Sequence, residues 1–221
     1  MIAEWPIIFT LLMVHCAGLV SPGPDFLLVV QHSAREGRST GVAIALGLAT
    51  GLAAHTAFAI IGVSLVIHQY PILYIAVQLL GGGYLAYLGL LGAKSVWQHF
   101  RSPQPVNALS ANHPLTSHLA FRQAFSRGLF TNLLNPKVIV FFLSLISSLI
   151  PAHMSIQGKS IIIALLFLAS FAWFATLALV FSSAKVQKKY LSLGRYLDGI
   201  CSLIFISVGL SIIEHAFYSL N

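Results

Sequence analysis

The stretch WPIIFTLLMVHCAGLVSPGPDFLLVV, residues 5–30, is an apolar run interrupted by Ser21-Pro22-Gly23-Pro24-Asp25. Apolar runs of this length cross membranes, and an ionisable side chain inside one is costly. Two prolines and a glycine release backbone N–H and C=O groups from helical bonding, and lipid cannot pair them. The break must therefore face protein or a water-filled cavity, which makes it a candidate transport site.

The composition of the chain excludes a soluble protein. Of 221 residues, 57% are hydrophobic and 8% are charged, and the mean hydropathy is +0.88. A chain of this kind cannot cover itself with polar surface. Glu4 and the lack of a basic segment before the first apolar run favour a retained helix over a cleaved signal peptide. We predict an all-α polytopic membrane protein with one transmembrane domain over residues 1–221.

Six apolar stretches reach the roughly 20 residues that a helix needs to cross the hydrocarbon core. They cover about residues 5–31, 40–67, 71–92, 126–150, 158–184 and 198–218, with a cytoplasmic link over about 93–125. Between the spans one side carries only Lys159, whereas the other side carries Arg35, Arg38, Lys94, Arg101, Arg122, Arg127, Lys185, Lys188, Lys189 and Arg195. The positive-inside bias then places both termini outside.

The same patterns exclude several other classes of protein. The net charge of +7 follows from the basic connections, which suit anionic lipid, and no basic stripe interleaved with aromatic residues suggests nucleic-acid binding. Cys16 and Cys201 lie in apolar segments, so we expect buried thiols and no disulfide. No spacing of His, Cys and carboxylates indicates a metal site, a cofactor or an enzyme.

A second break lies in the fourth span, at Asn132-Leu133-Leu134-Asn135-Pro136-Lys137. Three spans, a long link and three more spans suggest a duplication, and an odd number of spans inverts one half relative to the other. Transporters of this design carry broken helices near the midplane. We therefore predict two inverted three-helix repeats with broken helices in spans 1 and 4.

Each break also predicts a new helix start. Proline favours the first helical position, which places Asp25 or Lys137 in the first turn of a half-helix. The first N–H groups of a helix carry partial positive charge, and such a terminus suits a carboxylate ligand.

Together these residues resemble a known family. The runs Ser-Pro-Gly-Pro-Asp-Phe at 21–26 and Phe-Thr-Asn-Leu-Leu-Asn-Pro-Lys at 130–137, with six spans, resemble the LysE/RhtB family of amino-acid exporters. Ala172-Trp173-Phe174 and Leu197-Asp198-Gly199 are similar to its homoserine and threonine efflux branch. The resemblance implies proton-driven export of small neutral amino acids across the bacterial inner membrane, without ATP or a prosthetic group. An oligomeric state does not follow from it.

An amino-acid substrate needs a carboxylate for its ammonium group and positive groups for its carboxylate. We hypothesise that Asp25 binds the ammonium group or carries the coupled proton. Lys137 and the backbone at Pro22, Gly23 and Pro24 receive the substrate carboxylate. The second break would supply Asn132 and Asn135 to polar substrate atoms and Pro136 to start the half-helix.

Several alternatives stay open at this point. Asp25 and Lys137 can instead form a structural ion pair, and Asn135 can act only as a helix cap. His15 and His55 lie mid-span, where either can relay protons or simply pack. An ion or metal-cation transporter is the second function, favoured if Asp25, His15 and His55 share a cavity and disfavoured if Lys137 lies in it.

Small residues predict where helices touch. Gly47 and Gly51 are four residues apart in the second span, and Gly81, Gly82, Gly83 and Gly89 recur in the third. Such rows allow close helix packing in membranes, although a glycine triplet also suits a hinge.

Overall fold

The chain is all-helical in a computed structural model that describes residues 4–20, 23–69, 71–101, 119–151, 153–181 and 184–218. The described residues contain α1 (Trp5–Val20), α2 (Pro24–Glu36), α3 (Arg38–Gln69), α4 (Pro71–Arg101), α5 (Phe121–Leu133), α6 (Pro136–Leu149), α7 (Ile156–Val180) and α8 (Ala184–Tyr218). The prediction of an all-α polytopic membrane protein is therefore confirmed.

The two halves of the chain have the same order of elements, two short helices followed by two long ones. Helices α1 and α2 meet at a bend of 56°, and α5 and α6 meet at a bend of 60°. Four helices are long and apolar enough to cross a membrane, and the number rises to six if each bent pair is one span. Spans 1 and 4 are thus the broken ones, and the common order of elements supports the predicted repeat.

The predicted sixth span, about residues 198–218, agrees with the candidate membrane span Gly199–Tyr218. The helix that contains it, α8, is longer and begins at Ala184, so the segment from Lys185 to Arg195 is helical. Likewise α4 continues to Arg101 and α5 begins at Phe121, which shortens the predicted link over 93–125; its residues 102–118 lie outside the described part of the chain. Hydropathy locates the membrane boundary, whereas Lys, Arg and Gln are good helix formers that carry a helix beyond it.

Local chemistry explains where the short helices start. Pro24 and Pro136 occupy the first turn of α2 and α6, where a missing N–H costs nothing. The connection between α2 and α3 is Gly37 alone, with a φ of 95° that side-chain-bearing residues rarely adopt. The two breaks therefore end where Pro24 and Pro136 start the following helices, and Gly37 provides the sharp turn between α2 and α3.

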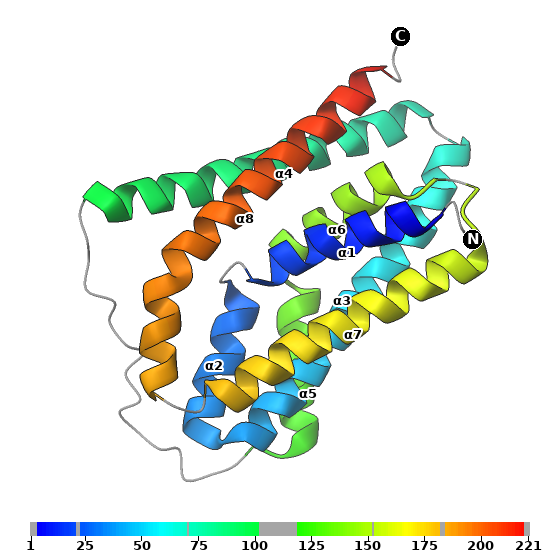
Figure 1. Cartoon of the computed structure of the whole chain (residues 1–221). Coiled ribbons are helices and arrows are strands. Elements are labelled where there is room, and N and C mark those ends of the chain that lie inside the picture. Colours follow the sequence, from blue (N-terminus) through cyan, green and yellow to red (C-terminus); the bar gives the residue numbers. More distant parts are fainter. Residues whose placement is uncertain are drawn as a thin grey trace.

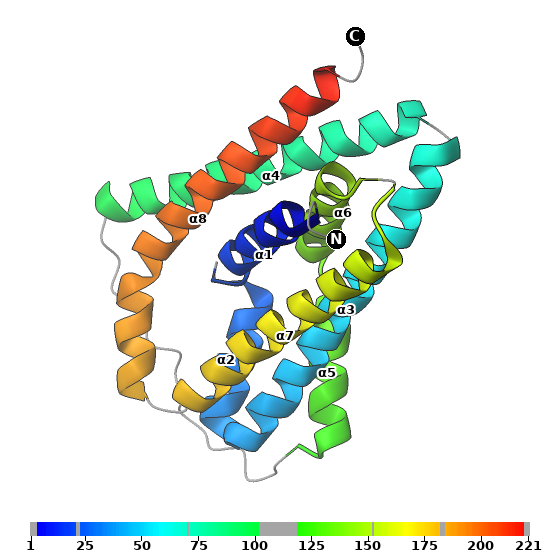
Figure 2. The same ribbon diagram turned by 45° about the vertical axis from the view of Figure 1, so that its right-hand side comes forward.

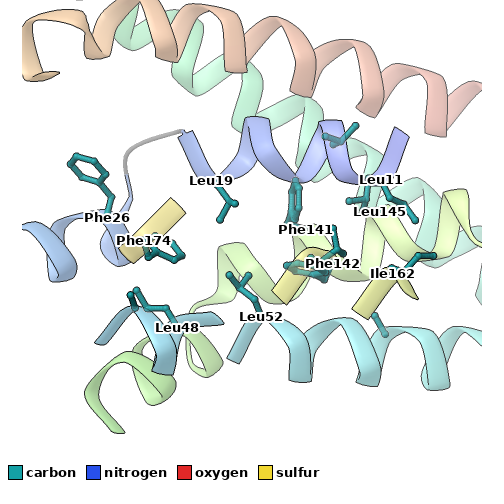
Figure 3. Packing of buried hydrophobic residues seen from close by; sticks show 14 of the residues in the cluster. Leu11, Leu19, Phe26, Leu48, Leu52, Phe141, Phe142, Leu145, Ile162 and Phe174 are labelled. Carbon is teal, nitrogen blue, oxygen red and sulfur yellow. The ribbon is translucent and has the colours of Figure 1, made fainter. Parts of the chain in front are cut away.

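Helices α1 and α6 lie between two pairs of long helices, whereas α2 and α5 pack against α3. Helices α4 and α8 pack side by side on one side of the molecule, and α3 and α7 pack on the other (Figures 1 and 2). The buried apolar side chains come from both halves; in Figure 3, Leu11 of α1, Leu145 of α6 and Ile162 of α7 lie in one cluster. Long helices from both halves of the chain therefore pack against the two broken helices.

Glycines bring α3 and α5 into backbone contact. A Cβ added at Gly47 would lie 2.1 Å from the carbonyl oxygen of Phe125, and one at Gly128 would lie 2.2 Å from that of Ile44. The predicted close-packing row at Gly47 is therefore confirmed.

The glycines of the third span contact two helices. A Cβ at Gly82 would lie 2.9 Å from Gly209 O of α8, and one at Gly81 would meet Ser144 of α6. The space around Gly83 is open. Packing therefore accounts for Gly81 and Gly82.

One polar contact joins the two halves at the start of α1. The carboxylate of Glu4 accepts hydrogen bonds from Ser155 N at 2.8 Å and from Ser155 Oγ at 3.0 Å. Ser155 is also the N-cap of α7, because its Oγ accepts from Gly158 N. The backbone N–H of Ser155 lowers the pKa of Glu4. Glu4 thus ties the beginning of the first half to a helix start in the second.

A second polar contact joins the two halves of the chain near the C-terminal end of α2. His32 Nδ1 lies 2.9 Å from Leu28 O, and Arg127 Nη1 of α5 lies 3.1 Å from His32 Nε2. Glu36 lies 3.8 Å from His32 and accepts from Leu119 N.

We expect Gly47→Ala and Gly128→Ala each to lower stability by about 1–3 kcal/mol, the usual effect of overpacking. The obstructing atoms are backbone carbonyl oxygens, which cannot rotate away. Thermal unfolding of the purified protein in detergent measures the loss. Gly83→Ala is the matched control because its added Cβ meets open space; an equal loss in this control would contradict the packing argument.

We expect Glu4→Gln to have a lower apparent Tm than the native protein at neutral pH. In acid, the difference between the two Tm values should become smaller. The folded-state pKa of Glu4 is lowered, so its contribution is fully present above the ordinary value of 4.5 and is lost as pH falls through the lowered pKa. Thermal scans between neutral and acidic pH test this. A Tm difference that stays constant with pH would refute it, and Glu214→Gln serves as the control.

Candidate functional site

The two breaks meet through the carboxylate of Asp25. Asn132 Nδ2 donates to Asp25 Oδ2 at 2.6 Å, and Asn135 Nδ2 donates to Asp25 Oδ1 at 3.4 Å. Both amides belong to the second break. Two residues more than a hundred positions after Asp25 therefore solvate its buried carboxylate. Burial of a carboxylate is costly unless it is hydrogen-bonded, and these two amides meet that need.

The starts of α2 and α6 are capped differently. Asn135 caps α6, since its Oδ1 accepts from Lys137 N at 3.1 Å. The same side chain donates to Asp25. The side chain of Asn135 therefore acts as a helix cap and also contacts Asp25. The N-cap of α2 is Gly23, which supplies no side-chain cap.

Asn132 lies against Asp25 and two residues of α3, His55 and Gly51. His55 Nε2 of α3 lies 3.2 Å from Asn132 O, and a Cβ added at Gly51 would lie 2.8 Å from Asn132 Oδ1. Asn132 is fully buried, and its Oδ1 lacks a hydrogen-bond partner within the described residues. Helix α3 therefore packs directly against the asparagine that donates to Asp25.

A cavity of about 70 Å³ lies beside these residues. Its charged and polar lining comes from Asp25, Asn135, Lys137 and His15. The remaining lining residues are Gly18, Leu19, Gly23, Pro24, Phe26, Leu52, Val138, Phe141, Phe142, Phe174 and Phe205. An acid and a base therefore face one small cavity, each from the first turn of a half-helix.

His15 is buried at the cavity wall. Its Nε2 lies 2.8 Å from Ser170 Oγ of α7, and its ring lies 5.6 Å from that of Phe142. Ser170 Oγ donates to Leu166 O at 2.6 Å, so its hydroxyl accepts from His15 Nε2. These contacts give His15 a packing role; a relay role for it stays a prediction.

The structure brings most of the predicted site residues together. Gly23, Pro24, Asp25, Asn135, Lys137 and His15 line the cavity, while Asn132, Pro136 and His55 stand directly behind the residues that do. Pro22 lies outside the described residues. Both asparagines donate to Asp25, so amides of the second break contact its carboxylate, and an ion pair between Asp25 and Lys137 stays a prediction.

Sequence reasoning missed the aromatic wall of the cavity. Phe141, Phe142 and Phe205 lie in apolar spans where phenylalanine is common, and nothing in their spacing distinguishes them. Phe174 belongs to the Ala172-Trp173-Phe174 run that contributed to the family resemblance, but its place in the cavity was not foreseen.

The position of Lys137 disfavours the second predicted function. A cation that entered the cavity would meet the ammonium group of Lys137 as well as Asp25. Among the residues that the structure describes, no group of three or more His, Cys, Asp or Glu side chains could hold a metal ion. The site instead combines both charge signs.

Comparison with known proteins gives the family of this architecture. The description "LysE type translocator" matches residues 16–215, which include both breaks. The chain belongs to the LysE family of translocators. It is 30% identical over 204 residues to the threonine efflux protein of Escherichia coli K12, which covers 92% of this chain and 96% of that protein. The threonine efflux protein of Salmonella typhi is 30% identical over 205 residues, 93% of this chain and 96% of its own.

An uncharacterized membrane protein of Haemophilus influenzae is also 30% identical, over 200 residues that make up 90% of this chain and 92% of that protein. No solved structure matches the chain. As a LysE-family translocator, the protein is embedded in the membrane, and the resemblance found at the two breaks is confirmed.

We expect Gly51→Ala to destabilise this LysE-family protein by about 1–3 kcal/mol through Asn132. The added Cβ would displace the amide that donates to Asp25. Combining Gly51→Ala with Asn132→Ala removes the obstructing Oδ1 and Cγ, so the double variant should lose less stability than the sum of the single variants.

Thermal unfolding in detergent measures all three variants. Gly62→Ala on the same helix is the control, because its Cβ meets nothing within 4 Å. Strict additivity of the two losses would show that Gly51 does not act through Asn132.

Proposed function

We propose that the protein is a secondary exporter of small neutral amino acids, of the kind represented by threonine and homoserine, in the bacterial inner membrane. The observation that carries this proposal is the presence of Asp25 and Lys137 on one cavity at two helix breaks. The similarity to threonine efflux proteins supports the direction of transport and the substrate class.

The geometry supports recognition of a zwitterion. The substrate ammonium group binds the Asp25 carboxylate, whose two amide donors leave lone pairs on both oxygens available. The substrate carboxylate binds Lys137 and the first N–H groups of α2, where the helix dipole favours an anion. A cationic or anionic molecule satisfies only one of these two groups, which favours a net neutral amino acid.

Proton coupling follows from the same carboxylate. A proton and a substrate ammonium group compete for Asp25, so protonation from outside would release the amino acid. His55 contacts the backbone of Asn132, which donates to Asp25, so it is a better candidate for a relay than His15, whose Nε2 contacts Ser170. The proton gradient then drives export without ATP.

Alternating access requires that each end of the site opens in turn. The contact between Glu4 and Ser155 holds α1 to α7 at one end, and that between His32 and Arg127 holds α2 to α5 at the other. With both termini outside, as the positive-inside bias predicts, the first contact is external and the second cytoplasmic. Each contact is a gate that joins the two halves.

We expect Asp25→Asn to lower amino-acid efflux by about ten- to hundredfold, because a hydrogen bond to a charged group contributes about 1.5–3 kcal/mol. Lys137→Gln should lower it to a similar extent through the substrate carboxylate. The measurement is efflux of labelled amino acid from proteoliposomes with an imposed proton gradient.

Glu214→Gln and Lys94→Gln are matched controls that change the same types of charge on exposed parts of α8 and α4. Size-exclusion profiles and thermal unfolding separate lost transport from lost folding. Well-folded Asp25→Asn and Lys137→Gln variants with normal efflux would refute the proposed site.

A further inference from the structure

The cavity beside the two breaks has room for a small solute only. Its volume is about 70 Å³, and a site for one water molecule takes at least about 10–15 Å³. The cavity therefore holds a handful of water molecules, which is the scale of a small amino acid. A single bulky side chain in the lining takes up a large share of such a space, so it can decide which solutes fit.

Among the described residues, five phenylalanines line the cavity, and Phe141 is the most exposed of them. Its exposed fraction is 6%, whereas the values are 2% for Phe26, 1% for Phe142, 3% for Phe174 and 3% for Phe205. The other four side chains are almost completely covered by protein. Phe141 therefore leaves the most surface for a neighbouring molecule to contact.

Phe141 also lies one helical turn after Lys137. Residues four positions apart share one face of an α-helix, and helical side chains lean back toward the N-terminus of their helix. The side chain of Phe141 thus leans toward the turn of α6 that carries Lys137, and both residues line the cavity. A solute whose carboxylate binds Lys137, as the proposed function requires, has its remaining atoms within reach of Phe141.

Neighbouring groups hold the ring of Phe141 in place. It lies 5.5 Å from the ring of Phe142 and 5.8 Å from that of Phe205, both in edge-on arrangements. On α1, a Cβ added at Gly18 would lie 3.2 Å from Phe141 Cζ, and Figure 3 shows the ring beside this helix. Protein interiors are close-packed, so a ring with these neighbours has little room to move aside for a larger solute.

We infer that Phe141 sets the upper size limit of the transported amino acid. A side chain of the size found in threonine or homoserine fits beside the ring, whereas that of leucine or phenylalanine requires the ring to move. One additional methylene group in a fitted apolar pocket changes discrimination about tenfold or more. This inference rests on the proposed function, and it names the residue that restricts the transporter to small substrates.

Counterflow with the full-length chain in proteoliposomes tests the size limit. Vesicles preloaded with unlabelled threonine take up labelled threonine, and external threonine, leucine or phenylalanine competes. For the native chain, we expect half-inhibition by leucine to need at least about a tenfold higher concentration than half-inhibition by threonine. In Phe141→Ala, and in the milder Phe141→Leu, this concentration ratio should fall several-fold because space opens beside the substrate.

Two further variants separate the size limit from a general loosening of the protein. Phe171→Ala removes a ring of α7 that stacks on Phe167 and does not belong to the cavity lining, so the ratio should stay native. Gly18→Ala adds a methyl group to the cavity lining beside Phe141. It should shift the preference several-fold from threonine toward alanine, and it tests the limit independently of the Phe141 variants. Thermal unfolding checks that each variant is folded.

Several outcomes would overturn the inference and leave the proposed function standing. They are a native chain that exchanges leucine as readily as threonine, a ratio that is unchanged in folded Phe141→Ala and Phe141→Leu, an equal fall of the ratio in Phe171→Ala, and an unchanged preference in Gly18→Ala. A native chain that exchanges no neutral amino acid would instead overturn the proposed function, and the inference with it.

Discussion

The buried carboxylate of Asp25 and its two amide donors form the interaction on which the rest of the structure depends. A charge at this depth is tolerated only with partners, and both partners, Asn132 and Asn135, come from the other break. The first broken helix therefore has to lie against the second. Helix α3 makes this possible, because Gly47 allows α5 to approach its backbone and Gly51 leaves space for Asn132.

The cavity beside the two breaks is lined by charged and by apolar side chains. Two prolines start two half-helices, and the residue after each proline is charged, negative in the first half and positive in the second. Opposite charges on one cavity suit a zwitterion, while the phenylalanines and leucines contributed by surrounding helices suit the apolar part of a solute. The polar contacts of Glu4 with Ser155 and of His32 with Arg127 also join the two halves. The proposed recognition and gating would both use contacts between the repeats.

Much of the fold could be predicted because membranes restrict structure to patterns that composition reveals. Long apolar stretches without polar faces must be helices, and a Pro-Gly-Pro run must end one. The six spans, the two breaks and the family followed from these features. The start of α8 at Ala184 did not, because a helix that leaves the bilayer needs no apolar residues and its basic segment looks like a loop. The weak sequence similarity between the two three-span halves also did not predict which residues of one half contact the other.

By itself, the sequence determined the class of protein, the positions of the breaks and the residues of opposite charge that follow Pro24 and Pro136. These properties depend on short stretches of chain and on the solvent around them. Only the tertiary structure decided that Asn132 and Asn135 solvate Asp25, that His55 supports Asn132, and that Phe141, Phe174 and Phe205 share a cavity with Lys137. Such contacts join residues from different helices, and the rotation of each helix is set by close packing at glycines. In a uniformly apolar span, hydrophobic periodicity cannot specify that rotation.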